Sequence, residues 1–242
     1  MTDDGLKSLL TERYAMAQTP WGRWRLDLRV RWKRLTWKFV LGGALLIKRV
    51  FDVVATLGLL ILLNPLLLII ALLIKLEDHG PVLFIQRRVG KHGREFRMYK
   101  FRSMFVDAES RLRALLAENQ HEQGVTFKMK NDPRVTRVGK WLRKLSFDEL
   151  PQLFNVVKGD MSLVGPRPPI PREVELYRPE DRRRLEVVPG ITCLWQIGGR
   201  SEIDFSGQVR LDVQYIESQS FWGDLKILLK TVPAVLTGHG AY

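Results

Sequence analysis

The stretch that decides the fold is Val53–Ile74, VVATLGLLILLNPLLLIIALLI, in which 22 successive residues carry no charge. A helix of this length would reach about 33 Å, which is enough to cross the hydrocarbon core of a bilayer. Asn64 and Pro65 stand in its middle, and proline removes a backbone donor and clashes with the preceding turn. Two structures remain open at this point: one kinked spanning helix, or a helix–break–helix hairpin that enters and leaves the membrane on one face.

The charges on both sides of this apolar run favour the hairpin. Lys48 and Arg49 precede the run, and a basic group follows it (Arg87, Arg88, Lys91, Arg94, Arg97). Basic flanks prefer the cytoplasmic side of a membrane, and a single span can place only one of its ends there. We therefore expect two limbs of about ten residues, each reaching about 15 Å, with both ends on the cytoplasmic face.

The composition bounds the possible partners. The chain has 242 residues, and its 39 Lys+Arg against 26 Asp+Glu give a net charge of +13. Such a charge suits nucleic acid, an anionic membrane surface or phosphorylated substrates. A hydrophobic share of 45% excludes a wholly disordered chain. The single cysteine, Cys193, excludes an internal disulfide and fits a reducing compartment.

Residues 1–50 hold +7 of that charge together with four tryptophans (Trp21, Trp24, Trp32, Trp37). Basic residues interleaved with tryptophan suit the lipid headgroup region, where an amphipathic ring sits half in water. The same mixture could bind RNA, but a broken apolar run is unexpected in an RNA-binding protein. This segment is predicted to be an interfacial anchor or an oligomer contact.

The chain after the apolar run reads as a mixed α/β domain. Short strands are expected over residues 82–86 and 96–101, with Lys100 and Arg102 on one face of the second strand. Amphipathic helices are expected over residues 209–218 and 220–236. The predicted fold is therefore helix-rich, with a small β-hairpin or sheet.

Two adjacent acids form the candidate catalytic site. Ser146-x-x-Glu149 before an apolar run is the pattern of a capping box, in which Asp148 only complements the helix dipole. Pro151 argues for a shorter, special element, and neighbouring carboxylates repel unless a cation or a phosphate lies between them. An aspartate at a helix start could instead attack phosphorus, with its neighbour holding Mg²⁺. Both interpretations remain open on these residues alone.

Three basic residues could neutralise a pyrophosphate beside these acids: Lys100, Arg143 and Arg167. Arg167 lies between Pro166 and Pro168, which would hold its guanidinium in one place, as a bidentate phosphate contact requires. The sequence contains no phosphate-binding G-x-x-x-x-G-K-[ST] loop, no G-x-G-x-x-G motif and no Cys/His cluster with zinc spacing. These reaction classes are disfavoured.

From about residue 46 to its C-terminus, the chain resembles a known family. The segments that carry the resemblance are KRVFD at 48–52, the interrupted apolar run, KFRSM at 100–104, DPR at 132–134, SFDELPQ at 146–152, DMSLVGPRP at 160–168, PGIT at 189–192 and WQ at 195–196. In this order they resemble the bacterial sugar transferases, the monotopic polyprenyl-phosphate phosphoglycosyl transferases.

The resemblance implies a reaction and the residues that perform it. It makes Asp148 the nucleophile on the sugar-linked phosphorus of a UDP-sugar, so that UMP leaves and undecaprenyl phosphate then takes the sugar phosphate. It implies Mg²⁺ held near Glu149 and Asp148, and it makes Arg143, Arg167 and Pro168 phosphate-binding groups. It places the enzyme on the cytoplasmic face of the bacterial inner membrane, at the start of exopolysaccharide, capsule or O-antigen assembly.

These expectations divide the chain into a basic Trp-rich segment (1–45), a re-entrant membrane hairpin broken at Asn64 and Pro65 (46–80) and a cytoplasmic catalytic domain (81–242). Lys100, Arg102 and Arg200 are further predicted substrate-binding residues. A homo-oligomer is an additional expectation, and nucleic acid is not expected as a partner. The alternative is a non-catalytic basic protein that binds membrane surfaces or RNA.

Overall fold

A computed structural model describes residues 14, 17–108, 110, 132–199 and 203–237. The chain divides into two units, Met1–Arg49 and Val50–Tyr242. The helices and strands, in chain order, are α2 (Pro20–Asp78), β1 (Leu83–Val89), η1 (Lys91–Gly93), β2 (Glu95–Phe101), α4 (Arg137–Lys144), η2 (Phe147–Glu149), α5 (Gln152–Lys158), β3 (Ser162–Val164), α6 (Pro171–Glu175), η3 (Asp181–Leu185), β4 (Gly190–Thr192), α7 (Leu194–Gly198), α8 (Phe205–Glu217) and α9 (Phe221–Thr237).

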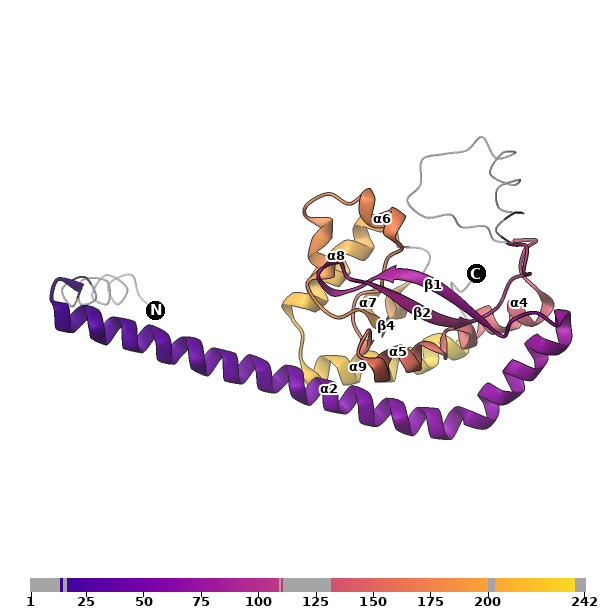
Figure 1. Cartoon of the computed structure of the whole chain (residues 1–242), viewed down its shortest axis with the longest axis horizontal. Coiled ribbons are helices and arrows are strands. Elements are labelled where there is room, and N and C mark those ends of the chain that lie inside the picture. The colour runs from indigo at the N-terminus through magenta and orange to yellow at the C-terminus, as the bar shows by residue number, and fades with distance from the viewer. Residues whose placement is uncertain (1–13, 15–16, 109, 111–131, 200–202, 238–242) are drawn as a thin grey trace. The chain divides into compact units, whose positions relative to one another are not determined.

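Helix α2 is one uninterrupted helix of 59 residues with Pro65 inside it. The interruption expected at Asn64 and Pro65 is therefore absent, and a bent helix takes its place: the last part of α2 turns away from the direction of the part before it (Figure 1). A proline inside a helix deletes only one hydrogen bond, so bending lets the remaining bonds persist.

The apolar part of α2 is largely exposed. The segment Gly42–Asp78 is long and apolar enough to cross a membrane, with a mean hydropathy of 2.9 over its most apolar stretch. Ile61 and Leu62, just before the predicted break, are 78% and 74% exposed. Exposed apolar surface on this scale marks an interaction with lipid or with another protein.

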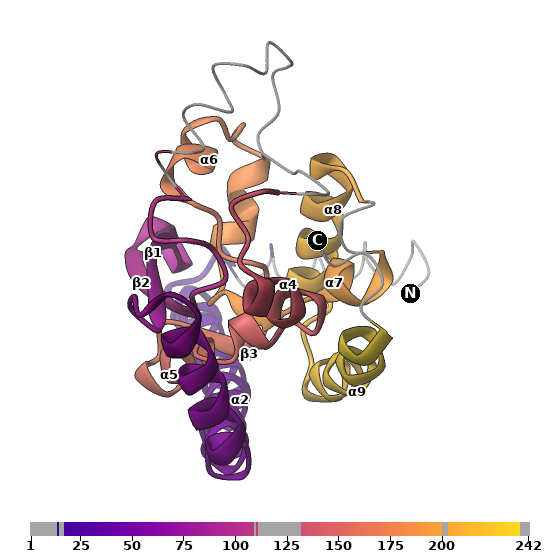
Figure 2. The same cartoon turned by 90° about the vertical axis from the view of Figure 1, so that its right-hand side faces the viewer.

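The predicted β-hairpin is confirmed, with both strands longer than expected. β1 and β2 pair antiparallel, and Lys100 lies opposite Phe84 in the register. α6 packs against β1 and α5 packs against β2, so that the hairpin lies between these two helices in both views (Figures 1 and 2). The hairpin thus delivers Lys100 next to the turn that precedes α5.

A second pair of strands, which is parallel, holds the Pro-Arg-Pro segment (residues 166–168) in place. β3 pairs with β4, and the chain leaves β3 directly into Gly165 and Pro166. A Cβ atom on Gly190 would lie 2.0 Å from the backbone nitrogen of Gly165, so only glycine allows this approach. Gly190 also donates its N–H to the carbonyl of Pro166 at 2.9 Å. The position of Arg167 therefore depends on this contact between backbones.

Two apolar clusters flank the turn that carries the candidate catalytic pair of acids, Asp148 and Glu149 (the dyad). The first has Leu153 in it, and α2 residues Phe51 and Ala55 pack against it. The second contains Ile70 of α2, and Phe147 and Leu150 pack against that cluster. The residues on both sides of Asp148 and Glu149 are thereby anchored by packing against the second cluster.

Both ends of the apolar run are bonded to the same folded body. At its start, buried Asp52 accepts a 2.7 Å hydrogen bond from Ser162 of β3. At its end, Glu77 accepts the backbone N–H of Arg137 at 2.8 Å, and Asp78 forms an ion pair with Arg102. α2 therefore leaves and rejoins one domain.

Candidate active site

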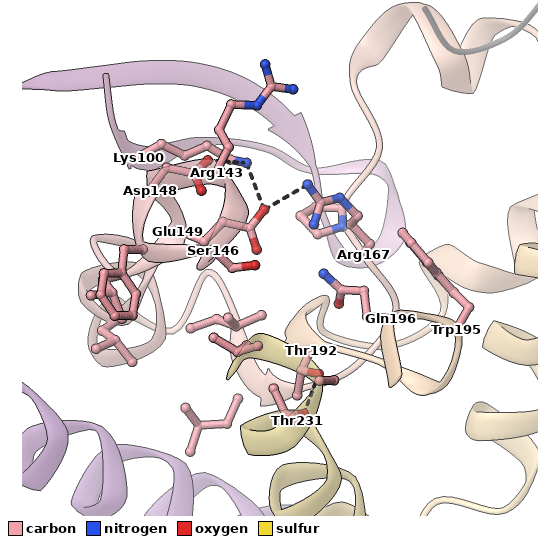
Figure 3. Close-up of a pocket in the computed structure, with 18 of the residues that line it drawn as sticks. Lys100, Arg143, Ser146, Asp148, Glu149, Arg167, Thr192, Trp195, Gln196 and Thr231 are labelled. Atoms are coloured by element: carbon pink, nitrogen blue, oxygen red, sulfur yellow. Dashed lines mark hydrogen bonds and ion pairs between the residues drawn. The ribbon is translucent and has the colours of Figure 1, made fainter. Parts of the chain in front are cut away.

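A cavity of about 700 Å³ lies where η2, β2, α7 and α9 meet the Pro-Arg-Pro segment. Figure 3 shows its charged side chains gathered at one end, around Asp148 and Glu149, and Thr192 with Thr231 on the side of α9. Elements from α2 to α9 contribute to its wall, so the complete fold is needed to build it.

The dyad stands on a tight turn rather than on a helix start. Phe147–Glu149 form a single 3₁₀ turn, and α5 begins only at Gln152, after Pro151. Ser146 has φ 56°, a left-handed conformation that favours glycine, and its hydroxyl caps nothing. The predicted capping box is therefore wrong, and so is the placement of Asp148 at a helix N-terminus. A strained residue beside the dyad is typical of functional turns.

Glu149 is held between two cations. Its Oε1 accepts hydrogen bonds from Lys100 Nζ and from Arg167 Nη2, both at 2.9 Å. Lys100 Nζ also lies 3.9 Å from Asp148 Oδ2. The structure thus brings together four of the predicted site residues, and their side chains are only 13% to 30% exposed.

Burial and these cations separate the pKa values of the two acids. Burial raises the pKa of Asp148 to about 6, against the opposing charge of Lys100, and the charge of Glu149 contributes to the rise. Burial alone would also raise the pKa of Glu149, but Arg167 and Lys100 outweigh it and hold that pKa well below its usual value. Near neutral pH both acids are ionised, and Asp148 is the more basic of the two.

The other predicted contacts divide into two groups. Arg143 and Pro168 line the cavity, and the Arg143 guanidinium points away from the two carboxylates (Figure 3). Arg102 is 6% exposed, forms its ion pair with Asp78 and is not part of the cavity wall, so its predicted role in substrate binding finds no support here. Arg200 lies outside the described residues.

Several residues line the cavity although nothing in the sequence indicates that they belong to the site. The sequence marks Arg88 only as a basic flank of the apolar run, whereas its side chain lines the cavity. Thr192 and Thr231 meet at 2.8 Å between their hydroxyl oxygens although 39 residues separate them. Arg184 joins the wall through a buried ion pair with Asp212 at 2.5 Å. Residues this far apart in the chain leave no local signal of their contact.

The far end of the cavity is apolar and is built by two helices. Leu59 and Leu63 come from α2, and Leu228, Val232 and Val235 come from α9. Because Leu59 and Leu63 precede Pro65 on the exposed apolar helix, this end of the cavity adjoins the surface that suits lipid. The cavity therefore fits a ligand with an anionic head and an apolar chain.

Comparison with known proteins decides the family. The profile described as bacterial sugar transferase matches residues 43–238, most of the chain.

The chain belongs to the bacterial sugar transferase family.

Curated relatives agree with this assignment. The chain is 52% identical over 206 residues to the galactosyl transferase CpsE of Streptococcus agalactiae serotype III (strain NEM316), covering 84% of this chain and 45% of the relative. It is 45% identical over 199 residues to the undecaprenyl-phosphate galactose phosphotransferase of Salmonella typhimurium (81% and 42% covered). It is 44% identical over 198 residues to the exopolysaccharide production protein ExoY of Rhizobium meliloti (81% and 88% covered). The match spans less than half the length of the first two relatives.

The dyad of this sugar transferase offers suitable oxygens for Mg²⁺. The hydrogen bonds that Glu149 accepts from Lys100 and Arg167 both use Oε1 and not Oε2, and Glu149 and Asp148 both line the cavity. Among the described residues no group of three acidic, His or Cys side chains could hold a metal by itself. Mg²⁺ commonly takes one or two carboxylates and completes its shell with substrate phosphates and water, so these two residues fit it.

Proposed function

We propose that the chain transfers a sugar 1-phosphate from a UDP-sugar to undecaprenyl phosphate and releases UMP. The observation that carries this proposal is the Asp148–Glu149 pair, held beside Lys100 and Arg167 at the charged end of a cavity whose other end is apolar. Names of relatives, such as undecaprenyl-phosphate galactose phosphotransferase, support the substrate class.

In the first step, an Asp148 oxygen attacks the sugar-linked phosphorus of the donor. The bond from this phosphorus to the bridging oxygen breaks, and UMP leaves with that oxygen and its electron pair. Asp148 then carries the sugar 1-phosphate as an acyl phosphate. The raised pKa of Asp148, about 6 through burial, supports this role because it keeps the carboxylate nucleophilic while ionised at neutral pH.

In the second step, a phosphate oxygen of the polyprenyl acceptor attacks the same phosphorus. The bond from phosphorus to the Asp148 oxygen breaks, Asp148 returns as a carboxylate, and the product is a sugar linked to the lipid through a diphosphate. Lys100 and Arg167 stabilise the charge on the transferred phosphoryl group, and Arg143 supplies a further positive charge. Mg²⁺ held by Asp148 and Glu149 would neutralise phosphate charge and fix the donor.

The apolar end of the cavity supports a lipid-linked acceptor. An isoprenoid chain can lie against Leu63 of α2 and Val232 of α9 while its phosphate reaches Asp148. No water-soluble nucleotide requires such a wall. The alternative of a non-catalytic basic protein, bound to membrane surfaces or RNA, has no comparable observation in its favour.

The membrane topology proposed with this function is re-entrant, on the cytoplasmic face of the bacterial inner membrane. Asp52 and Asp78 bracket the apolar run, and both bond to the catalytic domain. A run that crossed the bilayer would place these two contacts on opposite sides of it, which one folded domain cannot serve. The bend in α2 at its apolar part is consistent with a helix that dips into one leaflet.

Cysteine labelling tests this topology. Val50→Cys and Pro81→Cys introduce thiols at exposed positions on either side of the run, while native Cys193 is buried and does not compete. We expect both thiols to react with a membrane-impermeant maleimide in inverted membrane vesicles and neither to react in intact spheroplasts. Labelling of one position in each preparation would contradict the re-entrant topology.

Release of UMP tests the function itself. The full-length protein in detergent with undecaprenyl phosphate and Mg²⁺ is offered UDP-glucose, UDP-galactose and their N-acetylamino forms in turn. We expect UMP from at least one donor. No UMP from any donor, or UDP as the released nucleotide, would contradict the proposed function.

A further inference from the structure

Arg88 is a cation at the cavity wall that the two steps of the proposed reaction do not use. It lies on β1, its side chain is half-buried, and its guanidinium reaches the Pro-Arg-Pro segment. Nη1 donates to the carbonyl oxygen of Pro168 at 2.9 Å. The next residue of the strand repeats this link, since Val89 N–H donates to the carbonyl of Pro169 at 2.9 Å.

The acceptors of Arg88 are neutral. Nε and Nη2 donate to Gln86 Oε1 at 3.1 and 2.7 Å, and Nη1 uses the Pro168 carbonyl. No ion pair joins Arg88 to a carboxylate of the described chain, unlike Arg167, whose Nη2 reaches Glu149. A half-buried guanidinium without a counter-ion is costly unless an anion comes from elsewhere.

A second cation beside Arg88 makes this arrangement less favourable still. Burial, together with the charge of neighbouring Arg167, lowers the pKa of Arg88 to about 10. Two guanidinium groups side by side at a cavity wall are typical of sites that bind phosphate, because the phosphate screens each from the other. Four of the five donor N–H groups of a guanidinium lie on Nη atoms, and Arg88 commits only one N–H of each Nη to the protein contacts above.

The place of Arg88 indicates which phosphate it would meet. Lys100 Nζ lies 3.9 Å from Asp148 and Arg167 bonds to Glu149, whereas Arg88 bonds to Pro168, the residue after Arg167, from the strand against which α6 packs. Arg88 therefore stands beyond Arg167 from the nucleophile. In a diphosphate whose reacting phosphorus lies at Asp148, that position belongs to the other phosphorus.

We propose that Arg88 and Arg167 form a two-arginine site in which Arg88 binds the phosphate that leaves with the nucleotide. Arg167 then lies between the transferred and the leaving phosphate groups, and Arg88 stabilises the charge that builds on the departing UMP. This inference rests on the proposed function and extends it to a residue of the leaving-group site. The lipid acceptor brings its own phosphate to Asp148 and does not use Arg88.

Binding of UMP to the full-length protein in detergent, measured by calorimetry, tests this assignment. Arg88→Gln removes the charge, and we expect it to weaken UMP binding roughly ten- to a hundredfold. Arg88→Lys keeps a charge without the fork and should give an intermediate loss. The matched control is Arg87→Gln, since Arg87 is the adjacent arginine, 78% exposed with a loose contact to Glu95, and it should leave binding unchanged.

Steady-state kinetics separate ligand binding from a merely structural role. We expect Arg88→Gln to raise the KM for the UDP-sugar by a similar factor while the KM for undecaprenyl phosphate stays within about twofold. UMP binding within about threefold of the wild type, or equal losses for both substrates, would overturn the assignment of Arg88. A wild-type protein that neither binds UMP nor releases it would overturn the proposed function first, so the two failures are distinguishable.

Discussion

Lys100 donates a 2.9 Å hydrogen bond to Glu149 across 49 residues of sequence, and this contact couples the β-hairpin to the catalytic turn. It depends on Asn155 of α5, which is fully buried and bonds to the backbone of β2 on both sides: its Nδ2 donates to Arg97 O at 2.7 Å, and its Oδ1 accepts from Tyr99 N at 3.0 Å. The strand is thereby fixed one residue before Lys100.

The pH dependence of the reaction should change when the charge of Lys100 is removed. The raised pKa of Asp148, about 6, means that activity falls as the pH drops through that value, because the nucleophile becomes protonated. Lys100 lowers this pKa, so Lys100→Met should move the acidic limb of the rate profile to higher pH by about one unit. The measurement is kcat/KM for the UDP-sugar between about pH 5 and 9. Lys91→Met, at an exposed position of the hairpin turn, serves as the control; an unmoved limb in Lys100→Met would refute the electrostatic role.

The backbone contact behind Arg167 should be intolerant of a single methyl group. In Gly190→Ala the new Cβ would meet Gly165 N at 2.0 Å and displace the segment that carries Arg167. We expect a loss of stability of about 1–3 kcal/mol and a fall in kcat of roughly tenfold or more. Gly198→Ala is the matched control, because a Cβ atom added there would have nothing within 4 Å. Equal activity of the two variants would show that the close approach does not position Arg167.

The buried ion pair between Arg184 and Asp212 should dominate the stability of the cavity wall. The side chains are 5% and 1% exposed, so Asp212→Ala leaves an unpaired buried guanidinium and should destabilise the protein by about 3–5 kcal/mol. Arg183 and Glu217 form an exposed pair on the neighbouring surface, at 45% and 60% exposure, and Glu217→Ala should cost about 0–1 kcal/mol. Denaturant unfolding of both variants compares the two directly, and similar losses would contradict this difference.

Sequence patterns predicted the parts of the fold that local chemistry specifies. Two short segments on either side of a glycine-containing turn predicted the strands of the hairpin, and the paired acids with a proline-flanked Arg167 predicted the core of the site. Around Asn64 and Pro65 the structure keeps one bent helix, the alternative to the favoured break, and the left-handed Ser146 was not predicted, since tertiary packing overrides the local preference for a break or a cap. Arg88 was missed because its partner Pro168 lies 80 residues further along the chain.

The most direct test of the catalytic claim is mass spectrometry of the protein after incubation with a UDP-sugar and Mg²⁺ in the absence of lipid acceptor. We predict stoichiometric UMP release and a phosphosugar adduct on the peptide that contains Asp148, with both lost in Asp148→Asn. Undiminished UMP release by Asp148→Asn, or an adduct on a different residue, would contradict the assignment of Asp148 as the nucleophile.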